Sequence, residues 1–200
     1  MNKENMSKET RSEKIIKCTD DPQSELFDSI VKKFMEIKEF YQGCCLNKDI
    51  CLKHVYKVSS NDTNIINSYE FFLKNYGPIY GKGFDMYGPI SSDHNSECQT
   101  NDLLSMQSDF KEYLLTTKKE AVKSNFLIAS EDSGEQYYID CSDIGKGNIY
   151  SIDNDDEIKF FSDSLLEFLN KIFAKYKEKE KEENVNYKIK KLLEEKKLRL

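Results

Sequence analysis

Apolar residues in the second half of the chain occur in short runs separated by turn-forming segments. The runs cover residues 126–129, 136–141, 148–152 and 157–161. Between them stand Glu-Asp-Ser-Gly, Asp-Ile-Gly-Lys-Gly and Asp-Asn-Asp-Asp, which are compositions typical of tight turns. Runs of this length joined by such turns predict an antiparallel β-meander.

A helix is predicted directly after the meander. Ser164 and Glu167 have the spacing of a capping box, in which each residue satisfies a free backbone N–H of the first turn. Apolar residues then recur at helical spacing. They are Leu165, Leu169, Ile172, Phe173 and Tyr176.

Two helical stripes precede the meander. The first follows Pro22, ends at Gly43 and consists of Leu26, Ile30, Phe34, Ile37 and Tyr41. The second ends at Gly77-Pro78, with N-cap candidates at residues 61–63, and consists of Ile65, Ile66, Tyr69, Phe72, Leu73 and Tyr76.

Other segments complete the expected architecture. Residues 44–60 are ambiguous between a strand pair and a loop, and residues 52–58 are compatible with an edge strand. Glycines bracket a short strand near residues 84–88, and residues 102–117 have a third helical stripe. The predicted fold class is therefore α+β, with N-terminal helices, an antiparallel β-meander sheet and a closing C-terminal helix packed across it.

This order of elements resembles the SUKH superfamily, the Smi/Knr-type domains found among bacterial immunity proteins, in viruses and in fungal cell-wall regulators. The resembling parts are the acidic Gly-containing turn at 131–135, the loop at 145–147, the strand residues Ile149-Tyr150 and the helix start Ser164-Leu-Leu-Glu-Phe-Leu169. Upstream, residues 69–77 look like the family's Y-x-x-F-L-x-x-x-G helix, so the resemblance spans residues 25–176. The chain lacks Trp, which many members carry.

Composition predicts one domain with tails. We expect a flexible arm over residues 1–20, a SUKH-like domain over 21–176 and a charged helical tail over 177–200. Neither a long apolar run nor a secretory signal is visible, so we expect a cytoplasmic protein without membrane association and with its six cysteines reduced.

The tail combines alternating charges with a narrow apolar stripe. The stripe consists of Val185, Ile189, Leu192, Leu193 and Leu200. It is compatible with an extension of the last helix, or a second short helix, whose apolar stripe packs on the domain while its charged residues face solvent. The alternative is a helix that forms a homo-oligomer or binds a partner.

Negative charge is concentrated in the meander. The tail from Lys177 holds nine basic and six acidic residues, a net of +3, so the other 176 residues carry −6 − 3 = −9. Ten acidic residues against two lysines between Glu131 and Asp163 give −8. Such a field disfavours direct nucleic-acid binding and steers basic partners. The alternative explanation is that Asp and Asn are simply good turn residues.

Catalytic and metal-binding patterns are weak. No G-x-S-x-G, P-loop or H-E-x-x-H pattern occurs, and His54 and His94 have no obvious nucleophile nearby in sequence. The segment from Asp153 starts like a calcium loop, but Ile158 occupies the position that requires Gly. Cys44, Cys45, Cys51 and His54 lack ordinary zinc spacing. We therefore expect no enzyme activity, no cofactor and no bound metal.

The resemblance implies an immunity or antitoxin protein that neutralises a cognate toxin, for example a nuclease, by binding it. The alternative is a Smi/Knr-type regulatory or scaffold protein that acts through protein-protein interaction. Because nuclease sites are basic, we expect a basic partner to contact the acidic turns. The predicted partner-binding residues are Glu131, Asp132, Glu135, Asp140 and Asp143, together with Asp85 and Tyr87 on the preceding strand.

Overall fold

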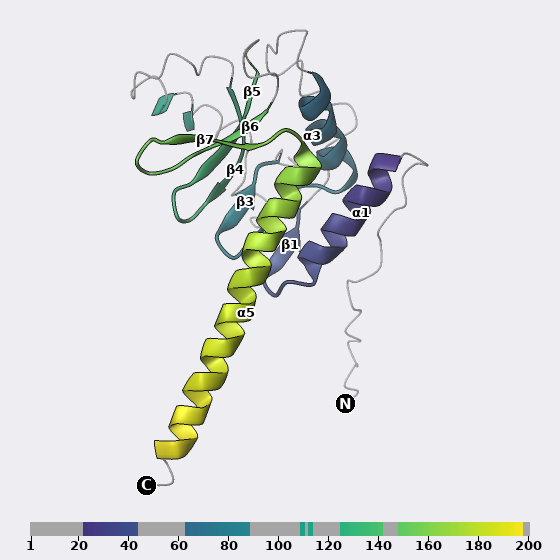
Figure 1. Ribbon diagram of the computed structural model, residues 1–200. Helices are drawn as coiled ribbons and strands as arrows, with labels where there is room; N and C mark the ends of the chain where they lie inside the picture. Colours follow the sequence, from purple (N-terminus) through teal and green to yellow (C-terminus); the bar gives the residue numbers. More distant parts are fainter. Residues whose placement is uncertain are drawn as a thin grey trace, which may run out of the picture.

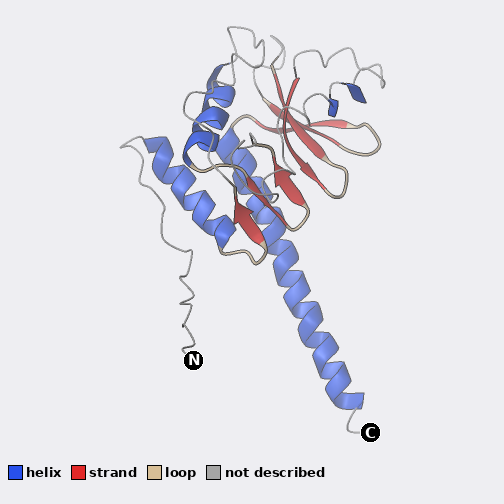
Figure 2. Cartoon of the chain, turned by 180° about the vertical axis from the view of Figure 1, so that it is seen from behind, coloured by secondary structure: helices blue, strands red, loops and turns tan. Residues whose placement is uncertain are grey.

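The computed structural model describes residues 22–43, 63–88, 109–110, 112–113, 125–141 and 148–197. In this part of the chain, helices α1 (Pro22–Met35), α3 (Thr63–Asn75) and α5 (Leu165–Lys197) pack on one face of a seven-stranded antiparallel sheet. The sheet lies behind α5 in Figure 1 and in front of it in the reverse view of Figure 2. The α+β prediction, with its closing helix, is confirmed.

The strands follow one another in the sheet in chain order, each antiparallel to the next. They are β1 (Phe40–Gln42), β2 (Ile79–Gly81), β3 (Phe84–Met86), β4 (Asn125–Glu131), β5 (Gln136–Asp140), β6 (Ile149–Ile152) and β7 (Ile158–Ser162). All four predicted meander strands are present as β4 to β7. In a meander, successive turns lie at alternate ends of the sheet, so the β4–β5 and β6–β7 turns share one end and the β5–β6 connection lies at the other.

Side-chain alternation along the strands separates two faces of the sheet. Tyr137 lies edge-on to Phe168 of α5, with ring centroids 5.3 Å apart. The next residue, Tyr138, points to the opposite face, where its ring lies 5.7 Å from that of Phe110. The face that carries Tyr137 is therefore the one that the helices cover.

The start of α5 follows the predicted capping pattern. The Glu167 N–H donates to Ser164 Oγ over 3.3 Å. The Glu167 carboxylate accepts from the N–H of Asp163 rather than from that of Ser164, one residue earlier than an ideal capping box requires. Leu165, Leu169, Ile172 and Tyr176 of the predicted stripe are buried. Together they anchor the first half of α5 to the sheet.

The prediction for the first helix is wrong at its C-terminal end. Helix α1 stops at Met35, eight residues before Gly43, and Glu39 has a φ of 69°. This left-handed residue turns the chain into β1, which carries Tyr41 with an exposure of 54%. The buried residues of the segment are Phe27, Ile30, Val31, Phe34 and Ile37, whereas Leu26 is exposed.

The second helical prediction is confirmed by α3, whose six predicted stripe residues are all buried. Gly77, with a φ of 72°, ends this helix in the conformation that favours glycine. The predicted arm 1–20 and strand 52–58 lie outside the described residues, as does most of the predicted helix 102–117.

The tail continues α5 without a break to Lys197 (Figure 1). Its apolar stripe does not pack on the described domain, contrary to the first of the two expectations. The exposures are 55% for Val185, 50% for Ile189, 60% for Leu192 and 56% for Leu193. Helix α5 is long enough to cross a bilayer but too polar to do so, and no other helix of the described chain has the required length and apolarity.

Candidate partner-binding surface

The turns at one end of the sheet touch one another. The Asn154 side-chain amide, in the β6–β7 turn, donates to the Ser133 carbonyl of the β4–β5 turn over 2.7 Å. The Asp132 N–H donates to the Gly83 carbonyl of the β2–β3 turn, also over 2.7 Å. We call this end of the sheet, residues 131–135 and 153–157, the acidic end.

The acidic end carries seven carboxylates. They are Glu131, Asp132, Glu135, Asp153, Asp155, Asp156 and Glu157. Their lysine partners in the described chain are Lys159 and Lys175, so the formal balance is −7 + 2 = −5. This concentration of charge produces a field that extends beyond the contacts themselves.

Glu131 belongs to the interior of the molecule rather than to its surface. It has an exposure of 5% and accepts from the Tyr137 hydroxyl over 2.6 Å. Lys175 of α5 donates to Glu131 over 2.7 Å and to Glu135 over 3.1 Å. We call these four residues the Glu131 corner. Because a buried carboxylate needs charged or hydrogen-bonded partners, this corner fixes α5 to the β4–β5 hairpin.

The pKa values of the Glu131 corner follow from burial and pairing. Burial alone lowers the pKa of Lys175, but the hydrogen bonds and charges of Glu131 and Glu135 outweigh it and leave this pKa raised. The pKa of the Tyr137 hydroxyl is raised by burial and by its hydrogen bond to Glu131. Both groups therefore keep their protons well above neutral pH.

The β6–β7 turn is organised by Asp153. Its carboxylate accepts from the N–H groups of Asp155 (3.1 Å) and Glu157 (2.9 Å) and from Lys159 (2.9 Å). The hydrogen bond with Lys159, followed by that with the Glu157 N–H, lowers the pKa of Asp153. Asp156 has a φ of 61°, which Asp tolerates better than most residues, and accepts from the Tyr113 hydroxyl. That hydrogen bond raises the pKa of Tyr113 to about 12.

Two carboxylates of the acidic end face solvent without an ion pair to the described residues. They are Asp132 and Asp155, both exposed. Asp132 lies over Gly83, where an added Cβ would be 2.8 Å from the carboxylate. Both carboxylates are exposed and make no ion pair with a described residue. A cation of a partner can therefore approach them with the smallest desolvation cost.

The structure separates the predicted partner-binding residues. Glu131, Asp132 and Glu135 lie together at the acidic end, whereas Asp140, half-buried, lies at the opposite end of β5. Asp143 is outside the described residues. Its place in the prediction is therefore not tested.

Two of the predicted side chains are not accessible as surface contacts. Glu131 is enclosed in its corner, and Tyr87, with an exposure of 2%, donates from its hydroxyl to Ser130 Oγ over 2.5 Å. Burial is the first cause of the raised pKa of Tyr87. Asp85 is half-buried on β3, opposite Ser130 of β4. Both side chains are buried, so neither Glu131 nor Tyr87 can make the partner contact expected of it without a rearrangement of its surroundings.

An exposed apolar patch next to the acidic end was missed by the sequence reasoning. Ile158 and Phe160 of the edge strand β7 are 41% and 57% exposed. Phe160 ends a row of aromatic rings on the face of the sheet opposite the helices, in which neighbouring centroids lie 5.7 to 6.0 Å apart. The row is Phe110, Tyr138, Tyr150 and Phe160.

A pattern in the sequence could have revealed the patch. Strand 158–162 has apolar residues at Ile158, Phe160 and Phe161, so it places apolar side chains on both faces of an edge strand. Phe161 contacts Phe168 of the core, and Phe160 points away from it. An exposed aromatic residue beside charged groups is typical of a protein-binding site.

Metal-binding geometry is not found within the described ranges, where no three His, Cys, Asp or Glu side chains are grouped to hold an ion. The cysteine and histidine pattern from Cys44 to His54 lies outside those ranges. What the described surface offers is a negative field with two solvated carboxylates and an aromatic side chain at its border. These features suit recognition of a basic protein surface.

Comparison with known families gives one result for the chain. The family model SUKH_6, described as SMI1-KNR4 cell-wall, matches residues 44–169, which is more than half of the sequence. The match includes α3 and strands β2 to β7 and ends inside the first turns of α5. No curated protein matches the sequence.

Proposed function

The chain belongs to the SUKH superfamily, and we propose that it acts by binding a protein partner rather than by catalysis. Within that role, we propose that it is an immunity or antitoxin protein whose partner is a cognate toxin with a basic active-site surface. A nuclease is the fitting class, because an enzyme that cleaves a polyanion must present positive charge to its substrate.

The observation that carries the proposal is the acidic end with its neighbouring aromatic residue. Asp132 and Asp155 supply exposed negative charge. Phe160 supplies an exposed aromatic side chain that a partner can bury with exclusion of water. Glu135 contributes charge at the border of the Glu131 corner. The charges accelerate encounter, and burial of Phe160 slows dissociation.

The position of each remaining predicted residue decides whether a partner bound at the acidic end can reach it. Asp85 lies on β3, beside the β4–β5 hairpin, and contributes to the same field. Asp140 lies at the other end of β5, so it takes part only if the partner spans the length of the strand. Asp143 lies outside the described residues and remains a candidate on the sequence alone.

A regulatory or scaffold role is the second candidate. The observation that favours it is the second half of α5, which projects beyond the sheet and carries exposed apolar residues that are not part of the acidic end (Figure 1). A scaffold would bind through this helix, whereas the toxin-binding proposal predicts that the tail is not needed for neutralisation.

The test pairs two charge-reversal variants with the toxin encoded beside the gene. Asp132→Lys/Asp155→Lys reverses the acidic end, and Glu36→Lys/Asp163→Lys makes the same change in net charge at two exposed positions elsewhere. We expect the first variant to lose about tenfold in association rate at low salt, to lose its salt dependence and to protect poorly in co-expression. The second variant should behave like wild type.

Two results would contradict the proposal. Equal association rates and equal salt dependence for the two variants would remove the acidic end as the contact. Failure of the wild-type protein to bind or protect against the neighbouring toxin would remove the immunity role and favour the scaffold.

A further inference from the structure

Strand β7 is the last strand of the described sheet, and part of its backbone is turned outward. The Asp153 N–H donates to the Glu157 carbonyl over 3.3 Å, and the pairing with β6 continues in register to Lys159. Hydrogen-bonded and non-hydrogen-bonded pairs alternate along an antiparallel ladder. Lys159 therefore directs its N–H and C=O groups toward β6, whereas Ile158 and Phe160 direct theirs away from the sheet.

The two residues with outward backbone groups also carry exposed apolar side chains. Ile158 is 41% exposed and Phe160 is 57% exposed. Both side chains lie on the face opposite the helices, because residues two apart in a strand share a face and Phe160 contacts Tyr150 there. Main-chain donors and acceptors beside apolar side chains are what a sheet edge offers to an added strand.

The open length of this edge ends after Phe160. The register of β6 and β7 shifts at the next residue, which leaves Phe161 as an extra residue in β7. The Phe161 carbonyl accepts from Lys171 Nζ over 2.5 Å, so α5 already occupies this part of the edge. Bulges and lysines are devices that close sheet edges. The part that stays open accommodates one short strand.

Charge beside the open edge indicates the chemistry of that strand. The turn that leads into β7 contains Asp153, Asp155, Asp156 and Glu157, and Lys159 is its lysine partner in the described chain, a balance of −4 + 1 = −3. In an antiparallel addition, the C-terminal end of the added strand lies beside this turn. Basic residues at that end are therefore favoured.

A second copy of β7 fits the edge poorly. A twofold antiparallel pair centred on Lys159 would place the two lysines opposite each other. A pair centred on Phe160 would place Glu157 opposite Asp163 of the other copy. Like charges directly opposite each other destabilise a strand pair, so the edge favours a different chain.

We propose that the cognate toxin adds an extended segment to β7 as an additional antiparallel strand. The segment has apolar side chains at alternate positions, which lie beside Ile158 and Phe160, and basic residues at its C-terminal end, which lie beside the acidic end. This inference rests on the toxin binding proposed above and specifies how the toxin is held. Main-chain hydrogen bonds give the contact its affinity, and the charges give its direction.

The experiment is residue-resolved amide hydrogen exchange of the full chain, measured by NMR with and without the toxin encoded beside the gene. We expect the amides of Ile158 and Phe160 to exchange at least about tenfold more slowly in the complex. The Lys159 amide, which the ladder already bonds to β6, should change least of the three. A contact through side chains alone would not produce this alternation.

Two substitutions of one residue separate the main-chain contact from the side-chain contact. Ile158→Ala removes most of the side chain and keeps the outward N–H, whereas Ile158→Pro also removes the N–H. Proline is accepted in an edge strand where the N–H faces outward. We expect the toxin Kd to rise by less than about fivefold for Ile158→Ala and by at least about fiftyfold for Ile158→Pro. Urea unfolding checks that both variants fold, and the wild-type exchange pattern does not depend on either.

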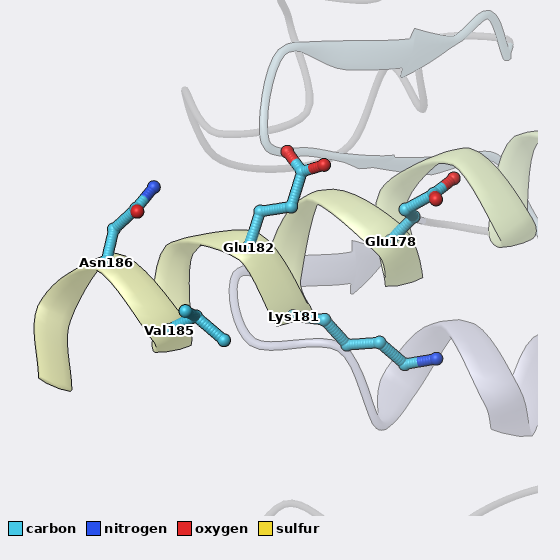
Figure 3. A pocket seen from close by; sticks show the side chains of 5 residues that line it. All are labelled: Glu178, Lys181, Glu182, Val185 and Asn186. Atoms are coloured by element: carbon cyan, nitrogen blue, oxygen red, sulfur yellow. The ribbon is translucent and has the colours of Figure 1, made fainter. Parts of the chain in front are cut away.

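A groove along α5 provides the control for contacts elsewhere. It is lined by Glu178, Lys181, Glu182, Val185 and Asn186, away from the edge of β7 (Figure 3). Truncation after Asn184 removes two of these residues and should leave the toxin Kd unchanged.

The outcomes distinguish this inference from the proposed function. Equal Kd values for the two folded Ile158 variants, or protection without alternation, would overturn strand addition and leave toxin binding in place. Failure of the wild-type chain to bind the toxin would remove both. Protection of Ile158 and Phe160 that appears without toxin as protein concentration rises would identify a second copy as the occupant and overturn the inference. Loss of binding on truncation after Asn184 would place the contact on α5.

Discussion

Two acidic turns lie side by side at one end of the sheet, and their charges have different roles. In the Glu131 corner, a carboxylate with 5% exposure is held by Tyr137 and by Lys175 of α5. In the β6–β7 turn, Asp153 is paired mainly with its own turn and with the exposed Lys159, and Asp155 faces solvent. The comparison shows that a count of acidic residues in a sequence combines buried carboxylates, which hold the fold together, with exposed ones. Only the exposed carboxylates are available to a partner.

Removal of the lysine that pairs with each turn is the strongest way to separate the two roles. Lys175→Met leaves a buried carboxylate without its cation, and we expect a loss of about 2 to 4 kcal/mol in the free energy of unfolding. Lys159→Met, whose side chain is 58% exposed, should leave the urea midpoint unchanged. Equal effects of the two substitutions would erase the proposed difference between the turns.

Alkaline unfolding of Tyr137→Phe beside wild type isolates the contribution of the Glu131 corner, because Tyr138, Tyr176 and Lys159 also have raised pKa values and are shared by both proteins. The pKa values of Tyr137 and Lys175 are raised in the folded protein, so the stability they contribute is complete below the unfolded pKa values, about 10, and is lost as pH rises above them. Tyr137→Phe should cost about 1 to 2 kcal/mol at neutral pH and reduce the slope of stability above pH 10. A slope identical to wild type would mean that Tyr137 ionises equally in both states.

Each edge of the sheet carries an exposed aromatic residue, and substitution of the two residues separates an effect on binding from an effect on stability. Phe160 on β7 is 57% exposed and Tyr41 on β1 is 54% exposed. Phe160→Ser and Tyr41→Ser should each change stability by less than about 1 kcal/mol, measured by urea unfolding. Only Phe160→Ser should speed toxin dissociation, by about tenfold in surface plasmon resonance. Equal dissociation rates would remove Phe160 from the contact.

The smallest effect on stability is expected from the tail. Contacts between α5 and the domain extend to Glu183, which pairs with Lys82 over 2.8 Å. Truncation after Asn184 keeps that pair and should change the free energy of unfolding of the monomer by less than about 0.5 kcal/mol in dilute protein. A larger loss would show that residues beyond Asn184 support the fold.

Much of the fold was visible in the sequence because its causes are local. The meander strands, the α3 stripe and the Ser164 cap each depend on residues within a few positions of one another. The end of α1 was missed because Glu39, an ordinary residue in sequence, adopts a left-handed conformation that starts β1. Without that turn, the apolar spacing reads as one longer helix.

The candidate site was only partly predictable, since burial of a charge depends on distant partners. Glu131 is enclosed because Lys175, 44 residues later, reaches it from α5, and no local pattern reports this contact. The separation of Asp140 from Asp132 could have been deduced, because successive turns of a meander lie at opposite ends. Ile158 and Phe160 stood in the sequence as apolar residues on both faces of an edge strand.

The most direct test of partner binding at the acidic end is hydrogen exchange of the full chain with and without the cognate toxin. We predict added protection of the amides in residues 132–135 and 153–160 and unchanged exchange at residues 138–141 and 148, at the opposite end of the sheet. Protection confined to that opposite end, or to the helices, would contradict the account.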